Sequence, residues 1–332
     1  MAGLLVAATV GRAAARPATA EPDIAALLAR FDKDEHPDLK GVVVRIGGTL
    51  VAERYFNGDR PDTLHDIRSA GKSITSLLVG AAYDRHLIAS LADPVRNYLP
   101  ELRSSAIGDV RLEDVLTMRS GLAANDEVEA SPGNEDRLDE ATDPIAFLRA
   151  VPRATAPGTQ YLYNSLTAYA AGLVAERAAR RNLADFGRTA LFGPLGIERF
   201  EWASDRAGHS KGQGNLSVTT RDLATIGQMV LDRGKYAGRQ VLSARWIEAS
   251  LRPRVTISAS DPYADGYGYF WYTKKWTVAG RPVTVHFASG NGGNKIYVVP
   301  ARHMVIGITS SAYGRGYGQR RSQAILAALL GA

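Results

Sequence analysis

The first clear hydrophobic pattern in the chain is a pair of short β-rich runs. Segment 41–56, GVVVRIGGTLVAERYF, places these runs on either side of Gly47 and Gly48. Two β-rich runs joined by a glycine pair are typical of a β-hairpin. The pattern therefore predicts two paired strands early in the chain.

After residue 69 the pattern becomes helical. Segment 72–87, KSITSLLVGAAYDRHL, is apolar on nearly every side, which is typical of a helix buried inside a protein. Helical patterns continue to about residue 200, with LEDVLTM at 112–118 and AYAAGLVAERAARRN at 168–182. The late segments are β-rich again and precede the apolar helix SQAILAALL; they read YGYFWYTKKWTVAG, RPVTVHFA, NKIYVVP and HMVIGITSS.

This order of strands, helices, strands and a last helix predicts an α+β fold. An antiparallel sheet would be assembled from both ends of the chain, residues 21–67 and 205–332, with a mainly helical insertion over 68–204. We expect the functional site in the cleft between the insertion and the sheet.

Composition narrows the chemistry. The 332 residues include no cysteine, which excludes thiol nucleophiles, disulfides and cysteine-ligated metals. The six histidines show no close ligand spacing, so no metal site is predicted. The net charge of +6 comes from scattered arginines, and the dense group of Arg315, Arg320 and Arg321 fits a solvated loop before the last helix. We therefore predict no nucleic-acid partner.

The first twenty residues resemble a secretory signal. Gly3 to Val10 is an apolar run, and Ala18-Thr19-Ala20 fits a cleavage site, although no basic residue precedes Arg12. This favours a periplasmic or secreted protein, and a frayed N-terminus of a cytoplasmic protein is the alternative. No other apolar run is long enough to span a bilayer, so no membrane span is predicted.

Ser69 and Lys72 form an S-x-x-K pattern where the buried helix begins. Residues three apart on a helix share a face, so the Lys72 amine can reach the Ser69 hydroxyl. Burial and the positive end of the helix favour a neutral amine, which can accept the serine proton. Taken alone, the pattern also fits a helix-capping serine with a solvated lysine.

Tyr163 and Ser165 follow in the segment PGTQYLYNS, just before another helix rich in small residues. A turn at Pro157-Gly158 can present Tyr163 to a cleft. A phenol close to a lysine cation can relay a proton between nucleophile and leaving group. A tyrosine packed in the core is the alternative.

The segment ASGNGG at 288–293 ends a β-rich run. Its glycines let the backbone approach a substrate closely. The N–H of Asn291 can then join the N–H of Ser69 as an oxyanion hole, with Ser289 and Gly290 beside the substrate. A glycine-rich hairpin turn is the competing interpretation.

These three elements, in this order, resemble the serine β-lactamase and penicillin-binding-protein superfamily. The likeness is to its class C-like branch, with family VIII-type esterases and 6-aminohexanoate-dimer hydrolase relatives. It runs from about residue 40 to the end, through IRSAGKSITSLLVG, DPVRNYLPEL, LEDVLTMRSGL, PGTQYLYNS, LSVTTRDLATIGQMVLDRG, YGYFWY and ASGNGGNKIYVVP.

The resemblance implies a β-lactamase-like fold and acyl transfer to water through an ester-linked acyl-enzyme. Ser69 would be the nucleophile, Lys72 its base and Tyr163 the third catalytic group. The resemblance implies no metal or organic cofactor. The partner would be a small-molecule ester or amide substrate.

Two positions depart from the class C pattern. Ser165 stands where class C β-lactamases carry asparagine, and Ala288 stands where their strand motif has lysine or histidine. That missing cation helps to hold a β-lactam carboxylate. His286 lies two residues upstream on the same strand face and could partly substitute; a strand histidine without a role is the alternative. We therefore predict an esterase or amidase for small or uncharged acyl substrates, with a β-lactamase or D-peptidase as the alternative.

Two further hypotheses stay open. Gly208-His209-Ser210-Lys211-Gly212 matches the G-x-S-x-G nucleophile elbow of α/β-hydrolases, with Asp222 or Asp261 and His286 as partners. The flanking segments offer neither a buried strand before it nor a helix directly after it. The other hypothesis is a non-catalytic sensor that is acylated slowly or not at all.

Overall fold

The computed structural model describes residues 23–331, so the candidate signal segment at 1–20 lies outside the described residues. The main element is an antiparallel sheet of eight strands in the order β2-β1-β13-β12-β11-β10-β9-β8. Strand β1, from the start of the chain, pairs with β13, from its end, which confirms the sheet predicted from the sequence. The strands are β1 (Leu39–Ile46), β2 (Thr49–Tyr55), β8 (Val255–Thr256), β9 (Gly266–Tyr267), β10 (Tyr272–Val278), β11 (Arg281–Gly290), β12 (Asn294–Val299) and β13 (Met304–Ser310).

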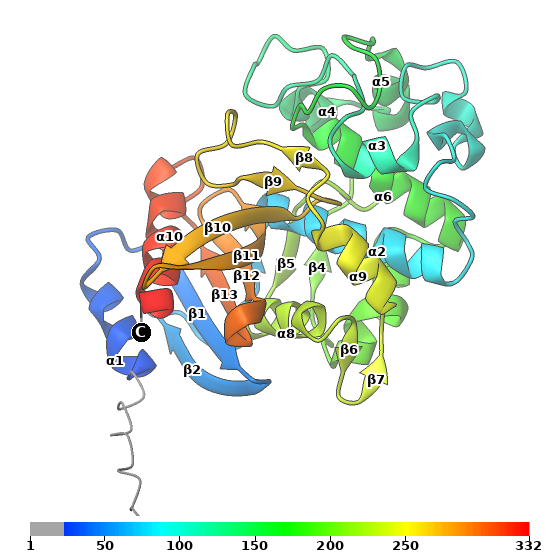
Figure 1. Cartoon of the computed structure of the whole chain (residues 1–332). Coiled ribbons are helices and arrows are strands. Elements are labelled where there is room, and N and C mark those ends of the chain that lie inside the picture. The colour runs from blue at the N-terminus through cyan, green and yellow to red at the C-terminus, as the bar shows by residue number, and fades with distance from the viewer. Residues whose placement is uncertain (1–22, 332) are drawn as a thin grey trace, which may run out of the picture.

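Helices cover both faces of this sheet (Figure 1). The terminal helices α1 (Ile24–Ala29) and α10 (Gly316–Gly331) lie on one side, and α8 (Thr220–Leu231) packs against β1, β12 and β13 on the other. Because both faces are covered, every side chain of β12 and β13 is buried.

The remaining helices build a second layer beside the sheet, drawn in cyan and green in Figure 1 except for α9, which is yellow. Among them α2 packs against α6, and its other neighbours include β11 and α9. They are α2 (Gly71–Asp84), α3 (Leu112–Leu116), α4 (Glu135–Glu140), α5 (Pro144–Ala150), α6 (Ser165–Ala179), α7 (Leu183–Gly187) and α9 (Ala244–Leu251). The α+β class is confirmed, and none of the described helices combines the length and apolar character that crossing a membrane requires.

The remaining short strands form two small sheets apart from the main one. A three-stranded sheet has the order β3-β5-β4, and β6 pairs with β7. Their bounds are β3 (His65–Asp66), β4 (Glu201–Trp202), β5 (Leu216–Val218), β6 (Lys235–Tyr236) and β7 (Arg239–Gln240). Because β3 ends at Asp66, it delivers the chain directly to the start of α2, where the candidate nucleophile lies.

Candidate active site

Ser69 lies in the short 3-10 turn η2 (Arg68–Ala70), which runs directly into α2. Arg68 has a φ of 52°, a left-handed conformation that is uncommon for a residue with a side chain. The Arg68 N–H donates to Asp66 Oδ1 at 2.8 Å and helps to hold this conformation. Left-handed non-glycine residues cluster at functional sites, where the surrounding structure compensates for their strain.

Lys72 lies one turn further along, inside α2, and its side chain is only 2% exposed. Its Nζ is 2.9 Å from Ser69 Oγ, 3.0 Å from Ser165 Oγ and 2.8 Å from the carbonyl oxygen of Gln213. The amine is therefore surrounded by three oxygens, one of which belongs to the candidate nucleophile.

The donors and acceptors around Lys72 can be assigned. The Gln213 carbonyl can only accept, and the Ser165 hydroxyl donates its hydrogen to Glu135 Oε2 at 2.6 Å. Ser165 Oγ must therefore accept from Lys72, so both oxygens take an N–H from the amine. The third position on the nitrogen points at Ser69, and in a neutral amine that position is the lone pair of a base.

Tyr163 and Ser165 are brought to the cavity by the start of α6. Asn164 caps this helix by accepting the Thr167 N–H at 2.7 Å, so the residues on either side of it are fixed in direction. The Tyr163 ring centroid lies 5.0 Å from Lys72 Nζ, within the range of a cation–π contact. Its side chain is half-buried and lines the same cavity as Ser69.

The end of strand β11 touches the Ser69 turn. A Cβ on Gly290 would lie 2.0 Å from the carbonyl oxygen of Ile67 and 3.1 Å from the Ala70 nitrogen. Only a residue without a side chain allows this approach. As a result Ser289, Gly290 and Asn291 line the cavity next to Ser69.

The cavity has a volume of about 520 Å³ and is rich in carboxylates. Burial raises the pKa of Asp126 to about 6, the charge of Glu135 adds to the effect, and Lys72 opposes it. Within residues 23–331, no group of three histidine or carboxylate side chains is arranged to hold a metal ion. The lining residues are Ser69, Asn125, Asp126, Glu127, Glu135, Tyr161, Leu162, Tyr163, Ser260, Asp261, Tyr272, Ser289, Gly290, Asn291 and Gln319.

The structure does not bring His286 into this lining. Its Nδ1 lies 3.0 Å from Thr273 Oγ1 on the neighbouring strand β10. Burial lowers the pKa of His286 to about 4, so the ring is uncharged at neutral pH. His286 therefore does not supply the positive charge that Ala288 lacks.

Sequence reasoning missed Asp126 and Glu135. Both belong to an acidic segment, NDEVEASPGNED at 125–136, that looks like a solvated loop. In the structure Asp126 Oδ2 accepts the Ser165 N–H at 2.7 Å, and Glu135 binds the Ser165 hydroxyl. No local pattern could have revealed these contacts, because their partners lie 30 and 39 residues away in the chain.

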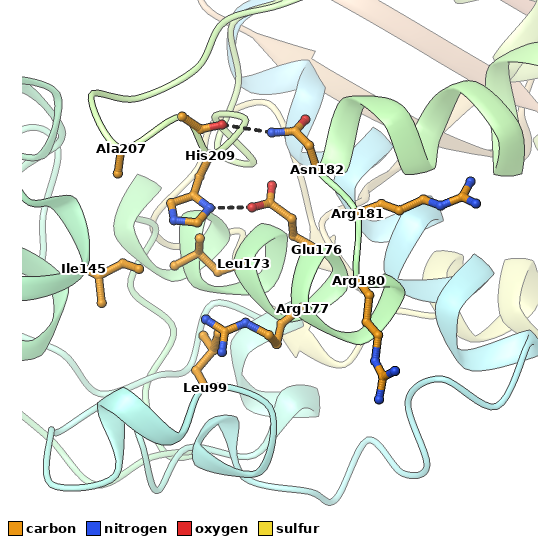
Figure 2. A pocket seen from close by; sticks show the side chains of 11 residues that line it. Leu99, Ile145, Leu173, Glu176, Arg177, Arg180, Arg181, Asn182, Ala207 and His209 are labelled. Atoms are coloured by element: carbon orange, nitrogen blue, oxygen red, sulfur yellow. Dashed lines mark hydrogen bonds and ion pairs between the residues drawn. The ribbon is translucent and has the colours of Figure 1, made fainter.

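The G-x-S-x-G serine is not a nucleophile in this fold. Ser210 is 2% exposed, and its hydroxyl donates to Asn182 Oδ1 at 2.6 Å. Figure 2 shows a second cavity, of about 400 Å³, in which His209 is bound to Glu176. Asp222 is used in capping α8. The α/β-hydrolase hypothesis is therefore wrong, because Ser210 lacks both access and a base, and the sheet is antiparallel.

Solved structures share this fold. A class C β-lactamase from Rhodobacter sphaeroides has a TM-score of 0.68 at 19% identity, covering 92% of this chain and 98% of its own. A family VIII carboxylesterase has a TM-score of 0.71 at 18% identity, covering 91% of this chain and 95% of its own. At such identities the likeness establishes the fold.

Sequence comparison extends the likeness. The chain is 27% identical over 273 residues to the 6-aminohexanoate-dimer hydrolase of Paenarthrobacter ureafaciens, spanning 78% of this chain and 69% of the relative. The sequence profile of the Beta-lactamase family matches residues 28–330, which is nearly the whole chain. The chain therefore belongs to the beta-lactamase family.

Proposed function

We propose that this protein is a serine hydrolase that cleaves small esters or linear amides through an acyl-enzyme on Ser69. The observation that carries the proposal is the 2.9 Å contact between Ser69 Oγ and Lys72 Nζ at the edge of the cavity. Hydrogen bonds to Ser165 and Gln213 hold the other two positions of the amine. A buried amine held in this way can act as a general base for an adjacent hydroxyl.

The reaction then proceeds in two halves. Ser69 Oγ attacks the carbonyl carbon and its proton passes to Lys72, while the N–H groups of Ser69 and Asn291 stabilise the oxyanion. Tyr163 gives its phenol proton to the leaving oxygen or nitrogen as the carbon–oxygen or carbon–nitrogen bond breaks, and it takes a proton back from Lys72. A water molecule attacks the resulting ester and loses a proton to the same groups, which return a proton to Ser69 Oγ as the acid is released.

Glu135 supports this chemistry through Ser165. Because its carboxylate accepts the Ser165 hydrogen, Ser165 Oγ stays an acceptor and orients the Lys72 amine toward Ser69. This arrangement gives a physical role to the serine that replaces the class C asparagine.

The acidic lining indicates the kind of substrate. Four carboxylates, those of Asp126, Glu127, Glu135 and Asp261, face the cavity, and Asp126 Oδ1 has no hydrogen-bond partner among the described residues. Such a lining favours a substrate with an ammonium group. The name of the Paenarthrobacter relative, a 6-aminohexanoate-dimer hydrolase, supports linear amides of amino acids as candidates.

Labelling with a fluorophosphonate tests the nucleophile. We expect the wild type and Ser210→Ala to be labelled and Ser69→Ala to stay unlabelled. Hydrolysis of p-nitrophenyl butyrate should fall by at least about 10³-fold in Ser69→Ala, because the covalent route is lost. Labelling that persists in Ser69→Ala would overturn the assignment.

A substrate panel separates hydrolase from sensor. The panel contains p-nitrophenyl esters, short linear amide oligomers and nitrocefin, each assayed on the wild type and on Ser69→Ala. Turnover of esters or amides that depends on Ser69 supports the proposal. Stable labelling without turnover would instead indicate a sensor, and a clear preference for nitrocefin would indicate a β-lactamase.

A further inference from the structure

Strand β11 ends in a hairpin turn whose first peptide group supplies an oxyanion donor in the proposed reaction. This is the peptide between Gly290 and Asn291, and both residues line the cavity beside Ser69. Gly290 has no side chain, so rotation of the backbone around it is less restricted than at other residues. The Asn291 N–H can serve the oxyanion only if this peptide is held in one orientation.

A side chain from the last helix holds this peptide group. Gln319 lies on α10, and its Nε2 donates to the carbonyl oxygen of Gly290 at 2.8 Å. The carbonyl and the N–H of a trans peptide point in opposite directions. Fixing the Gly290 oxygen therefore fixes the direction of the Asn291 N–H, which has no acceptor among residues 23–331.

The Gly290 oxygen also accepts a hydrogen bond from within the turn, the Gly293 N–H at 3.1 Å. That bond closes the turn and moves with it, so it sets the shape of the turn but not its direction relative to Ser69. Gln319 belongs to a separate helix. Its hydrogen bond therefore ties the peptide to the rest of the molecule.

Helix α10 packs closely against this turn. A Cβ on Gly293 would lie 2.3 Å from the carbonyl oxygen of Gly318, the residue before Gln319. One turn along the helix, Ser322 Oγ donates to the carbonyl oxygen of Gly293 at 2.6 Å. These contacts on either side of Gln319 fix the position from which it reaches Gly290.

The other end of the Gln319 amide argues against a purely stabilising role. The Gly290 carbonyl can only accept, so the group that faces it is the amide NH₂, and Oε1 lies on the other side. This Oε1 is buried and has no hydrogen-bond partner in the described part of the chain. A buried acceptor without a partner costs stability, and an apolar side chain of similar size would avoid that cost. Stability alone therefore does not explain a glutamine here.

We propose that Gln319 orients the oxyanion hole by holding the Gly290–Asn291 peptide. This inference rests on the proposed function of Ser69. Gln319 is a positioning residue, because it acts through the Asn291 N–H, which is the group that touches the oxyanion. The second donor, the Ser69 N–H, belongs to η2 at the start of α2. Loosening the turn therefore changes how the two donors lie relative to each other.

The experiment compares an ester with its thionoester. In O-p-nitrophenyl thionobutyrate a sulfur atom replaces the carbonyl oxygen of p-nitrophenyl butyrate, and sulfur is a weak hydrogen-bond acceptor. Loss of one oxyanion donor costs about 10²- to 10³-fold in rate, and a donor that is only misdirected should cost about 10-fold. Gln319→Met should therefore lower kcat/KM for the ester by about 10-fold and leave that for the thionoester nearly unchanged, so their ratio falls by the same factor.

Two further variants separate this role from a structural one. Gln319→Glu keeps the shape of the side chain and replaces the donor with a carboxylate, so at neutral pH it should lower the ratio at least as far. Gln323→Met makes a matched change one turn further along α10, at a half-buried position outside the cavity lining, and should leave the ratio unchanged. A loss of folded enzyme would lower both rates equally and would not move the ratio.

Labelling by the fluorophosphonate gives a second readout. Its rate should fall about 10-fold in Gln319→Met, because the phosphoryl oxygen takes the place of the oxyanion. An unchanged ester-to-thionoester ratio in both Gln319 variants would overturn the proposal, as would equal losses for the two substrates. Labelling that persists in Ser69→Ala would reject the proposed nucleophile and this inference with it. Labelling that requires Ser69, together with an unchanged ratio, would reject the role of Gln319 alone.

Discussion

At the scale of a single residue, Asp126 makes the charge of the cavity depend on pH. Its Oδ2 accepts the Ser165 N–H, while its Oδ1 has no partner in the described part of the chain. Because burial raises the pKa of this carboxyl to about 6, it loses its charge at a pH where ordinary carboxylates keep theirs. The attraction of the cavity for an ammonium group should therefore weaken as the pH falls through about 6.

We expect this dependence in the rates. For the wild type, the ratio of kcat/KM for a p-nitrophenyl ester of an ω-amino acid to that for its uncharged counterpart should rise between pH 5 and pH 7, since Asp126 becomes ionised. Asp126→Asn should remove the rise, and the exposed Glu198→Gln should keep it. A rise that survives in Asp126→Asn would contradict this role.

At the scale of elements, the packing of α8 against the main sheet shows how close the helix and the strands lie. Thr219 and Asp222 form a capping box that starts the helix. One turn and a half later, a Cβ on Gly227 would lie 2.5 Å from Val305 Cγ1 and 2.7 Å from Ile296 Cγ2. The helix therefore lies on the central strands with no space for a side chain at this point.

Gly227→Ala should accordingly destabilise the protein. Alanine favours a helix interior over glycine by about 1 kcal/mol, but overpacking a core costs about 1–3 kcal/mol. We expect the free energy of unfolding in urea to fall by about 1 kcal/mol, which is the middle of the difference between these two effects. Gly331→Ala, at a helix position with nothing within 4 Å, is the control and should change it little. Equal effects at the two positions would contradict this packing argument.

At the scale of the whole molecule, Arg321 joins the two ends of the chain. It lies on α10, and its Nη1 donates to Asp34 Oδ2 at 3.0 Å while its Nη2 donates to Asp38 and to Ser310 on β13. Its side chain is only 6% exposed. Burial alone would raise the pKa of Asp38, but hydrogen bonds from Tyr317 and Arg321 outweigh it and lower that pKa.

Removal of Arg321 should therefore destabilise the folded protein. Arg321→Met leaves two partly buried carboxylates without their partner, a change that costs about 3–5 kcal/mol. Because the pKa of Asp38 is depressed in the folded state, the stabilisation is present above its unfolded value and is lost as the pH falls through its folded value. The loss in the free energy of unfolding, measured in urea, should be large at pH 7 and smaller at pH 3.

The exposed neighbour Arg320 provides the matched control. Arg320→Met changes the net charge by the same amount and should alter stability by no more than about 0.5 kcal/mol. A loss for Arg321→Met that stays equal at the two pH values would contradict the linkage to Asp38.

Features that depend on residues close together in the sequence could be predicted from it, and features that depend on distant residues could not. The hairpin at β1 and β2 and the buried helix α2 are local patterns, and the structure contains both. Ser69 and Lys72 could be singled out together because they are three positions apart where η2 runs into α2. The family resemblance, confirmed by the profile match over residues 28–330, carried the expected fold for the rest of the chain.

The sequence by itself determined the residue types available for catalysis, the alternation of strands and helices, and the family. Only the tertiary structure decided which distant groups meet: Glu135 with Ser165, Lys295 with Ser289, and Ser210 with Asn182 rather than with a base. The physical reason is that a hydrogen bond depends on the positions of two atoms in space. Chain folding sets those positions through sheet register and helix packing, which no local pattern encodes.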